Sequence, residues 1–204
     1  MLRTFVEHRV RPVVSLGGLW DFITEPERKD RAALPKGYTR KIHVPSPWEM
    51  LPGLATYRGK GWLRRELPGG ATAGSAARLV FGGVSQTGRV FVDGKFVGEH
   101  YDAFTPWAVL VDGKSLGRRD VSEIVVEVDN AFGEHSALHI ENDYMTYGGI
   151  TRPAVMEIVP AMYVGKLFAT PVREGKSWRL DVRVRLHNWS DASQRRAVNV
   201  DVAG

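Results

Sequence analysis

Short segments that alternate apolar and polar side chains recur along this chain, and glycine and proline separate them. ARLVFGGV (residues 77–84) and VSEIVVEV (residues 121–128) are clear examples. A period of two places alternate side chains on opposite faces of a strand, whereas an amphipathic helix needs apolar residues three or four apart. No helical crossover pattern separates these segments, which disfavours a parallel α/β sheet. We therefore expect an all-β fold of the sandwich or jelly-roll type.

Turn signals support this interpretation. Asp93-Gly94 lies between two apolar runs, and a type I′ hairpin turn favours this pair because both central residues need a positive φ. TEPERKDRAALPKGYT (residues 24–39) is polar and contains proline, so we expect a long surface loop, with or without one helical turn.

A domain boundary is expected at Pro160-Ala161. Residues 1–160 contain enough strand segments to close one sandwich. Residues 161–204 offer three further strand candidates, at 163–170, 177–187 and 195–202, whereas an immunoglobulin-like sandwich takes about seven. We favour a second domain that is cut short over the alternative, in which these strands pack on the first domain and complete it.

Composition excludes several classes of protein. The 204 residues are 43% hydrophobic and include no cysteine, which indicates a globular chain without disulfides or thiolate sites. The net charge of +5 comes from dispersed arginines, so we expect no nucleic-acid partner. No run approaches the ~18 apolar residues of a membrane span, and the first residues lack a secretory core. We expect a cytoplasmic protein without a membrane partner, although a trimmed leader is left open.

Six segments, in order, resemble the N-terminal sugar-binding domain of the family-two glycoside hydrolases, which include β-galactosidases, β-glucuronidases and β-mannosidases. The segments are SLGGLWDF (15–22), KIHVPSPWE (41–49), YRGKGWLRREL (57–67), LVFGGVSQTGRVFVDGKFVGEHYDAFTPW (79–107), IVVEVDN (124–130) and NDYMTYGGITRPAVMEIVP (142–160). The chain departs from the family pattern at Leu63, which replaces a tyrosine, at Asp93, which replaces an asparagine, and at Asp102-Ala103, which replaces two glycines.

The resemblance implies a jelly-roll, galactose-binding-domain-like β-sandwich in residues 1–160. YVGKLFATPV (163–172) resembles the first strand of the family's immunoglobulin-like second domain, so residues 161–204 would be the first strands of that domain. The segment at 142–160 is closer to the β-glucuronidase version than to the β-galactosidase version, with Thr146 in place of an asparagine.

The resemblance also implies that this chain does not cleave the glycosidic bond itself. Retaining cleavage needs two carboxyl groups about 5–5.5 Å apart. In this family both are glutamates on a (β/α)₈ barrel of roughly 250 residues, for which this chain has no room. We expect no catalytic residue, no cofactor and an inactive chain. Glu141 and Asp143 lie on the same side of an extended segment, but a solvated loop is favoured over an independent catalytic pair.

Asp143 is the leading candidate for substrate binding. The aspartate at this position in the family lies on a loop that reaches the barrel's active site and hydrogen-bonds sugar hydroxyls, and charge-assisted bonds of this kind are strong. Tyr144 and Tyr147 would add apolar surface facing the sugar. Arg58 belongs to a segment that approaches the sugar in galactosidase-like relatives, although Gly59 here replaces the contacting asparagine.

Other conspicuous residues are assigned structural roles. We expect Arg152 to support the Gly148-Gly149 turn through an ion pair beneath it. His135 and His139 have the spacing of a helical zinc site, but they lie in a strand-like context without the accompanying acid, so we expect no metal.

The tryptophans fall into two groups. Trp20 and Trp62 occupy strand positions and are expected in the core. Trp48 and Trp107 lie in proline-flanked loops and are left open between an interface and a surface position.

The leading functional hypothesis is the non-catalytic N-terminal domain of a retaining β-glycosidase that hydrolyses terminal β-glucuronides or β-galactosides. Its partners would be the catalytic barrel of the parent chain and, through the parent's active site, the carbohydrate substrate; a homo-oligomer is left open. The alternatives are a free-standing carbohydrate-binding module and a purely structural interaction domain.

Overall fold

The computed structural model describes residues 11–69, 71, 74–116, 121–133 and 145–201. The chain divides into two compact units, Met1–Ile158 and Val159–Gly204.

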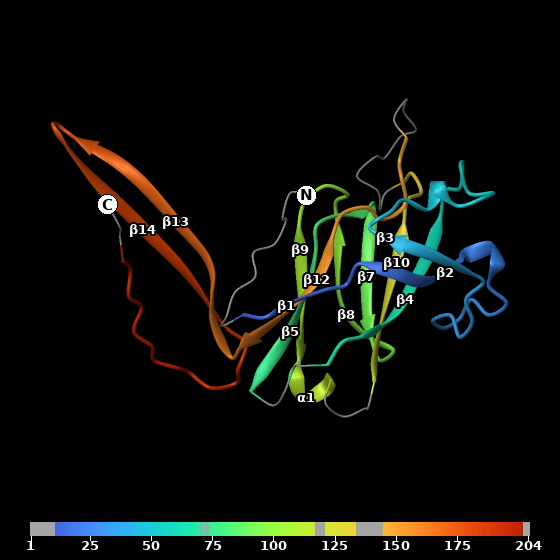
Figure 1. Cartoon of the computed structure of the whole chain (residues 1–204), viewed down its shortest axis with the longest axis horizontal. Coiled ribbons are helices and arrows are strands. Elements are labelled where there is room, and N and C mark those ends of the chain that lie inside the picture. Colours follow the sequence, from blue (N-terminus) through green and yellow to red (C-terminus); the bar gives the residue numbers. More distant parts are fainter. Residues whose placement is uncertain (1–10, 70, 72–73, 117–120, 134–144, 202–204) are drawn as a thin grey trace. The chain divides into compact units, whose positions relative to one another are not determined.

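The first unit consists of antiparallel strands in two main sheets (Figure 1). The four-stranded sheet has the order β1 (Val13–Ser15), β12 (Ala154–Pro160), β5 (Ser75–Phe81), β9 (Trp107–Asp112). The six-stranded sheet has the order β3 (Arg40–Val44), β2 (Gly18–Thr24), β4 (Lys60–Leu67), β10 (Ser122–Asp129), β7 (Thr87–Val92), β8 (Lys95–Tyr101). The short strands β6 (Val84–Ser85) and β11 (Gly149–Ile150) pair separately.

Helical elements in the described part are short. They are η1 (Glu25–Glu27), η2 (Trp48–Met50) and α1 (Gly113–Leu116). The expected all-β fold, with sandwich-like antiparallel sheets, is therefore confirmed. No helix of this part is both long and apolar enough to cross a membrane.

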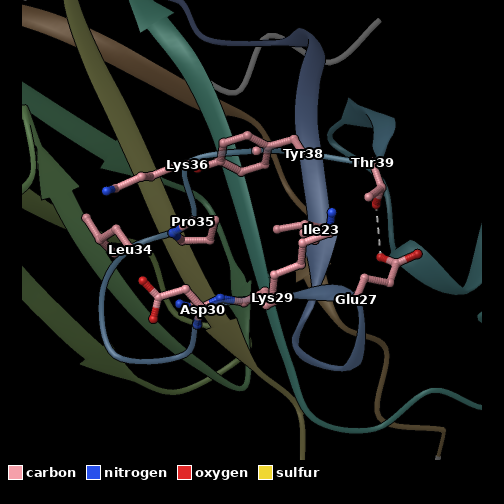
Figure 2. Close-up of a pocket in the computed structure, with 11 residues that line it drawn as sticks. Ile23, Glu27, Lys29, Asp30, Leu34, Pro35, Lys36, Tyr38 and Thr39 are labelled. Atoms are coloured by element: carbon pink, nitrogen blue, oxygen red, sulfur yellow. Dashed lines mark hydrogen bonds between the residues drawn. The ribbon is translucent and has the colours of Figure 1, made fainter.

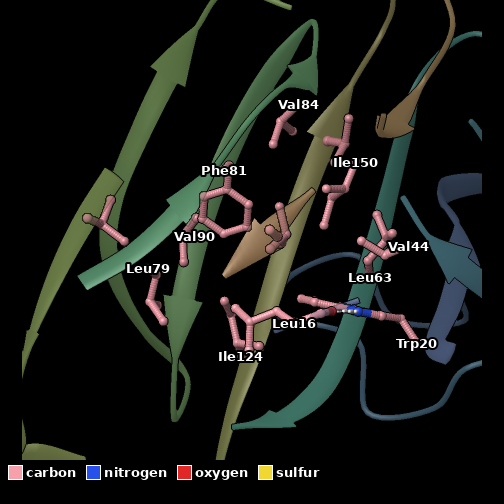
Figure 3. Packing of buried hydrophobic residues seen from close by; sticks show 14 of the residues in the cluster. Leu16, Trp20, Val44, Leu63, Leu79, Phe81, Val84, Val90, Ile124 and Ile150 are labelled. Carbon is pink, nitrogen blue, oxygen red and sulfur yellow. Dashed lines mark hydrogen bonds between the residues drawn. The ribbon is translucent and has the colours of Figure 1, made fainter. Parts of the chain in front are cut away.

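The hydrophobic core contains side chains from both main sheets (Figure 3). Central strand β10 has buried apolar side chains on both of its faces. Ile124, Val126 and Val128 are fully buried in the main core. Val125 points to the other face of the sheet, where it joins Ile23 and Trp62 in a second cluster. Both faces of β10 are thus covered.

Two local predictions are confirmed. Asp93 and Gly94 have φ values of +49° and +78°, the positive values that the turn between β7 and β8 requires. Residues 25–39 form an irregular loop that begins with η1. Glu27 ties this loop together by accepting hydrogen bonds from Thr24, Thr39 and Arg40.

All four tryptophans considered above are buried. Trp20 and Trp62 lie in strands with 1% and 2% exposure, as expected. The interface or surface position considered for Trp48 and Trp107 is wrong, because their exposures are 0% and 9%. Trp48 packs against Phe22 and Tyr57, with both ring centroids 5.7 Å away. Its flanking prolines belong to a loop that turns inward.

The second unit contains a long hairpin of β13 (Met162–Glu174) and β14 (Ser177–Asn188). Two of the three expected strands are thus present and longer than expected. The third, at 195–202, is wrong for its described part, since residues 190–201 form no strand. Alternating apolar residues indicate a strand only where a neighbouring strand accepts the backbone hydrogen bonds.

Candidate functional site

The site is built around residues 145–150. Asp143 and Tyr144 lie outside the described residues, and the described chain resumes at Met145. Tyr147 is half exposed, whereas Gly148 and Gly149 are buried. The segment therefore presents one predicted sugar-facing side chain next to a buried backbone anchor.

Two residues of η2 bind the N–H and the carbonyl of Gly148. The Trp48 N–H donates to the Gly148 carbonyl at 3.0 Å. The Gly148 N–H donates to both carboxylate oxygens of Glu49, at 3.0 and 3.1 Å. A Cβ at position 148 would lie only 2.0 Å from the Trp48 indole, so this close approach requires glycine.

The next two residues join the segment to the sheet structure. Gly149 has a φ of +111°, which residues with a Cβ rarely adopt. Gly149 and Ile150 pair with Ser85 and Val84, and the Ser46 N–H donates to the Ile150 carbonyl at 3.0 Å. The position of residues 148–150 is thus fixed from two sides.

Glu49 is the buried acid of the site, with a side chain only 5% exposed. Its Oε1 also accepts from the Asn130 amide at 3.2 Å and lies 3.6 Å from a guanidinium nitrogen of Arg58. Burial raises the pKa of Glu49, while the hydrogen bond from Gly148 and the charge of Arg58 oppose that rise.

Asn130, which follows β10, connects the surrounding segments. It is fully buried, and its amide also donates to the Thr146 carbonyl at 2.9 Å. Its Oδ1 accepts from the Gly59 N–H at 3.0 Å. One amide side chain therefore links Gly59, just before β4, and Glu49 in η2 to the segment that carries Tyr147.

Arg58 lies beside the same segment. One guanidinium nitrogen is 3.0 Å from the Met145 sulfur, and another donates to the Tyr57 carbonyl at 3.1 Å. A quarter of the Arg58 side chain is exposed. The Tyr147 N–H donates to the Met145 carbonyl at 3.1 Å. Arg58 and Tyr147 thus both contact Met145.

Arg152 does not make the contact that we expected in the described part of the chain. Its guanidinium donates to the Phe104 carbonyl at 2.7 Å, and its aliphatic stem packs near Gly82 and Gly83. The carboxylate beneath the Gly148 turn belongs to Glu49 instead. The physical reason is position, because η2 crosses directly under Gly148 whereas Arg152 follows β11 and extends toward the 102–105 loop.

Sequence reasoning missed Glu49, Trp48 and Asn130 as site-forming residues. Glu49 and Gly148 are 99 positions apart, and Asn130 and Thr146 are 16 apart. The available signal was the presence of all three in segments that resemble the family, VPSPWE and VEVDN.

A cavity of about 350 Å³ lies elsewhere, beneath the loop that follows η1 (Figure 2). Ile23, Leu34, Pro35 and Tyr38 form its apolar lining, and Lys29, Asp30 and Lys36 lie around it. None of the predicted site residues lines it. No group of three or more histidine, cysteine, aspartate or glutamate side chains that could hold a metal occurs among the described residues.

Comparison with solved structures places the chain in a broader context. A GH2 β-galacturonidase from Eisenbergiella tayi, solved with bound glycerol, is 36% identical, with a TM-score of 0.75 over 93% of this chain and 32% of its own. A β-glucuronidase from Ruminococcus gnavus is 19% identical with a TM-score of 0.70, over 90% of this chain and 35% of its own, and shows a shared fold.

Curated sequences agree with these structures. A protein of Formosa agariphila, named provisionally as a β-glucuronidase, is 24% identical over 89% of this chain and 22% of its own length. A β-galactosidase of Thermoanaerobacterium thermosulfurigenes is 29% identical over 41% of this chain and 12% of its own. No protein-family model matches the chain.

The chain spans about a third of the solved relatives and less than a quarter of the curated ones. The solved match at 36% identity covers nearly the whole chain and shares its antiparallel, sandwich-like fold. The chain therefore corresponds to a portion, about one third, of the GH2 β-glucuronidase- and β-galacturonidase-like glycoside hydrolases.

Proposed function

We propose that this chain is a non-catalytic N-terminal part of a retaining β-glycosidase, which supports the catalytic barrel and contributes a substrate-contacting loop. The observation that carries the proposal is the rigidly held segment at Gly148, next to which Tyr147 is half exposed and Arg58 partly exposed. A loop that contacts substrate needs such a buried anchor and an open edge.

In this proposal, residues 1–160 form the jelly-roll sugar-binding domain and residues 161–204 the first strands of an immunoglobulin-like domain. The two sheets of the first unit and the separate hairpin of the second support this division. The compact units divide two residues earlier than proposed, between Ile158 and Val159.

We further propose that the substrate is a terminal β-uronide, with a β-galactoside as the alternative. The 36% identical relative is a β-galacturonidase, and the provisional name of the Formosa protein is β-glucuronidase. A uronate differs from a neutral sugar by its carboxylate, which a guanidinium such as that of Arg58 binds well. The pair of carboxyl groups that cleaves the bond would lie on the barrel, so we expect this chain alone to be inactive.

The test uses an enzyme in which this chain precedes its barrel. Asp143→Asn removes one acceptor charge for the sugar hydroxyls, and a charged hydrogen bond is worth about 1.5–3 kcal/mol. We expect kcat/KM for an aryl β-uronide to fall by about tenfold to a hundredfold. Asp112→Asn is the matched control, because Asp112 is exposed and accepts a hydrogen bond from the Lys114 N–H at the start of α1. Kinetics unchanged by Asp143→Asn would contradict the proposal.

A further inference from the structure

Burying the Glu49 side chain carries a desolvation penalty. Its carboxylate is almost fully buried, and burial disfavours the charged form. An apolar side chain would fill the same space without the desolvation penalty, and such replacements of buried charges are often neutral or stabilising. A role that an apolar side chain cannot perform would explain the acid.

That role is suggested by the atoms that Glu49 contacts. The Gly148 N–H precedes β11, so it makes no ladder bond with β6 in the described register. The carboxylate supplies its acceptor, with both oxygens within 3.1 Å. Together with the bond from the Trp48 N–H to the Gly148 carbonyl, this fixes the two successive peptide units that meet at Gly148.

The same carboxylate also orients the neighbouring cation. Arg58 lies 3.6 Å from Glu49 on one side and 3.0 Å from Met145 on the other. Asn130 binds Glu49 and the Thr146 carbonyl together. Glu49 is therefore the common partner of Arg58, Asn130 and the backbone of Gly148.

We propose that Glu49 is the positioning residue of the substrate-contacting loop: its carboxylate fixes Gly148 and Arg58, and so sets where Tyr147 meets the sugar. The inference rests on the proposed function for its effect on substrate. The geometric part, that Glu49 holds Gly148, can be tested independently in the 204-residue chain.

The first experiment measures amide hydrogen exchange of Gly148 by NMR. Glu49→Gln keeps one oxygen but turns an NH₂ group toward the donors of Gly148, Asn130 and Arg58. Hydrogen bonds to charged groups are worth more than neutral ones. We expect Gly148 exchange to accelerate by about tenfold or more relative to the wild type.

Glu157→Gln is the matched control. Glu157, on β12, is also a largely buried acid, with a side chain 12% exposed. It pairs with Arg78 on β5 at 2.8 Å. This variant should leave Gly148 exchange unchanged, and amide protection in β10 checks that both variants remain folded. Gly148 exchange that is unaltered in a folded Glu49→Gln chain would overturn the inference.

A second measurement needs no variant. In the wild-type chain, the Gly148 amide shift should follow the titration of the Glu49 carboxyl carbon, with the same apparent pKa. Within the described part of the chain, Arg58 is the charged group that faces Glu49. Independent titration of the two signals would also overturn the inference.

The third measurement separates the inference from the proposed function. In the enzyme that carries the barrel, Glu49→Gln should raise KM for an aryl β-uronide about tenfold, with a smaller change in kcat. If Gly148 is released but the kinetics of Glu49→Gln and Asp143→Asn are both unchanged, the proposed function fails. If Asp143→Asn lowers activity while Glu49→Gln changes neither Gly148 exchange nor KM, the inference alone fails.

Discussion

Gly148 is the residue at which packing of the site leaves the least room. An alanine there would place its Cβ 2.0 Å from Cε2 and Cζ2 of Trp48, and that indole is fully buried. Inserting a methyl group into a well-packed core costs about 1–3 kcal/mol. Because neither η2 nor the indole can move freely, we expect Gly148→Ala to lower the free energy of unfolding by about 3 kcal/mol.

Chemical denaturation measures this change, with Gly37→Ala as the matched control. A Cβ at position 37 meets nothing within 4 Å, and its φ is not positive. That variant should therefore stay within about 0.5 kcal/mol of the wild type. Equal stability of the two variants would show that Trp48 yields to the added methyl group.

Single residues were predictable where their own strand determined their environment. Trp20 and Trp62 are core residues because alternation in β2 and β4 places them inward or beneath a covering loop. Trp48 was not predictable in this way, since prolines on either side are typical of exposed loops. Its burial depends on Phe22 and Tyr57 from other segments. The role of Glu49 was not predictable either, because Gly148, whose N–H it accepts, is 99 residues away.

At the scale of elements, a charged row connects four strands of the six-stranded sheet. Asp21 on β2 pairs with Lys41 on β3 and, at 3.0 Å, with Arg64 on β4. Arg64 in turn pairs with Glu123 on β10 at 2.8 Å. The hydrogen bond from Lys41, followed by that from Arg64, lowers the pKa of Asp21 against the opposing effect of its partial burial.

Asp21→Asn should therefore change how stability depends on pH. A carboxyl whose folded-state pKa is lowered stabilises the fold above its unfolded pKa of about 3.9, and this contribution is lost as the pH falls through the folded value. The pair is partly exposed, so we expect the wild type to exceed the variant by only about 1 kcal/mol at pH 7. Urea denaturation between pH 7 and pH 3 should show the gap closing at low pH; a gap that widens would contradict the pKa direction.

Elements were predicted best where both local signals and pairing agreed. The β7–β8 hairpin follows from Asp93-Gly94 between two apolar runs, and η1 follows from the polar loop after β2. The expected strand at 195–202 had the right alternation, but its described residues pair with no strand. Periodicity shows what a segment favours, whereas pairing depends on distant segments.

At the scale of the whole chain, the two units differ sharply in burial. The first unit contains the large core cluster shown in Figure 3. In β13 and β14 only Tyr163 is buried, while Leu167, Phe168, Trp178 and Leu180 are between 41% and 68% exposed. The sequence indicated this contrast through its incomplete set of strands after Pro160. The length of the hairpin was not predictable, because residues with polar side chains also take part in the backbone pairing of β13 with β14.

Hydrogen exchange should report this difference directly. A two-stranded hairpin is at best marginally stable in water, whereas a domain with a full core resists opening by about 5–15 kcal/mol. Amides of β14 such as Val184 should therefore exchange at least about a thousandfold faster than that of Val126 in β10. Repeating the measurement at tenfold lower concentration separates intrinsic stability from self-association through the exposed apolar side chains.

In an enzyme that completes the proposed immunoglobulin-like domain, further strands would cover the hairpin and slow exchange in β14. Equally slow exchange of Val184 and Val126 in the dilute 204-residue chain would mean that the hairpin is stable without them.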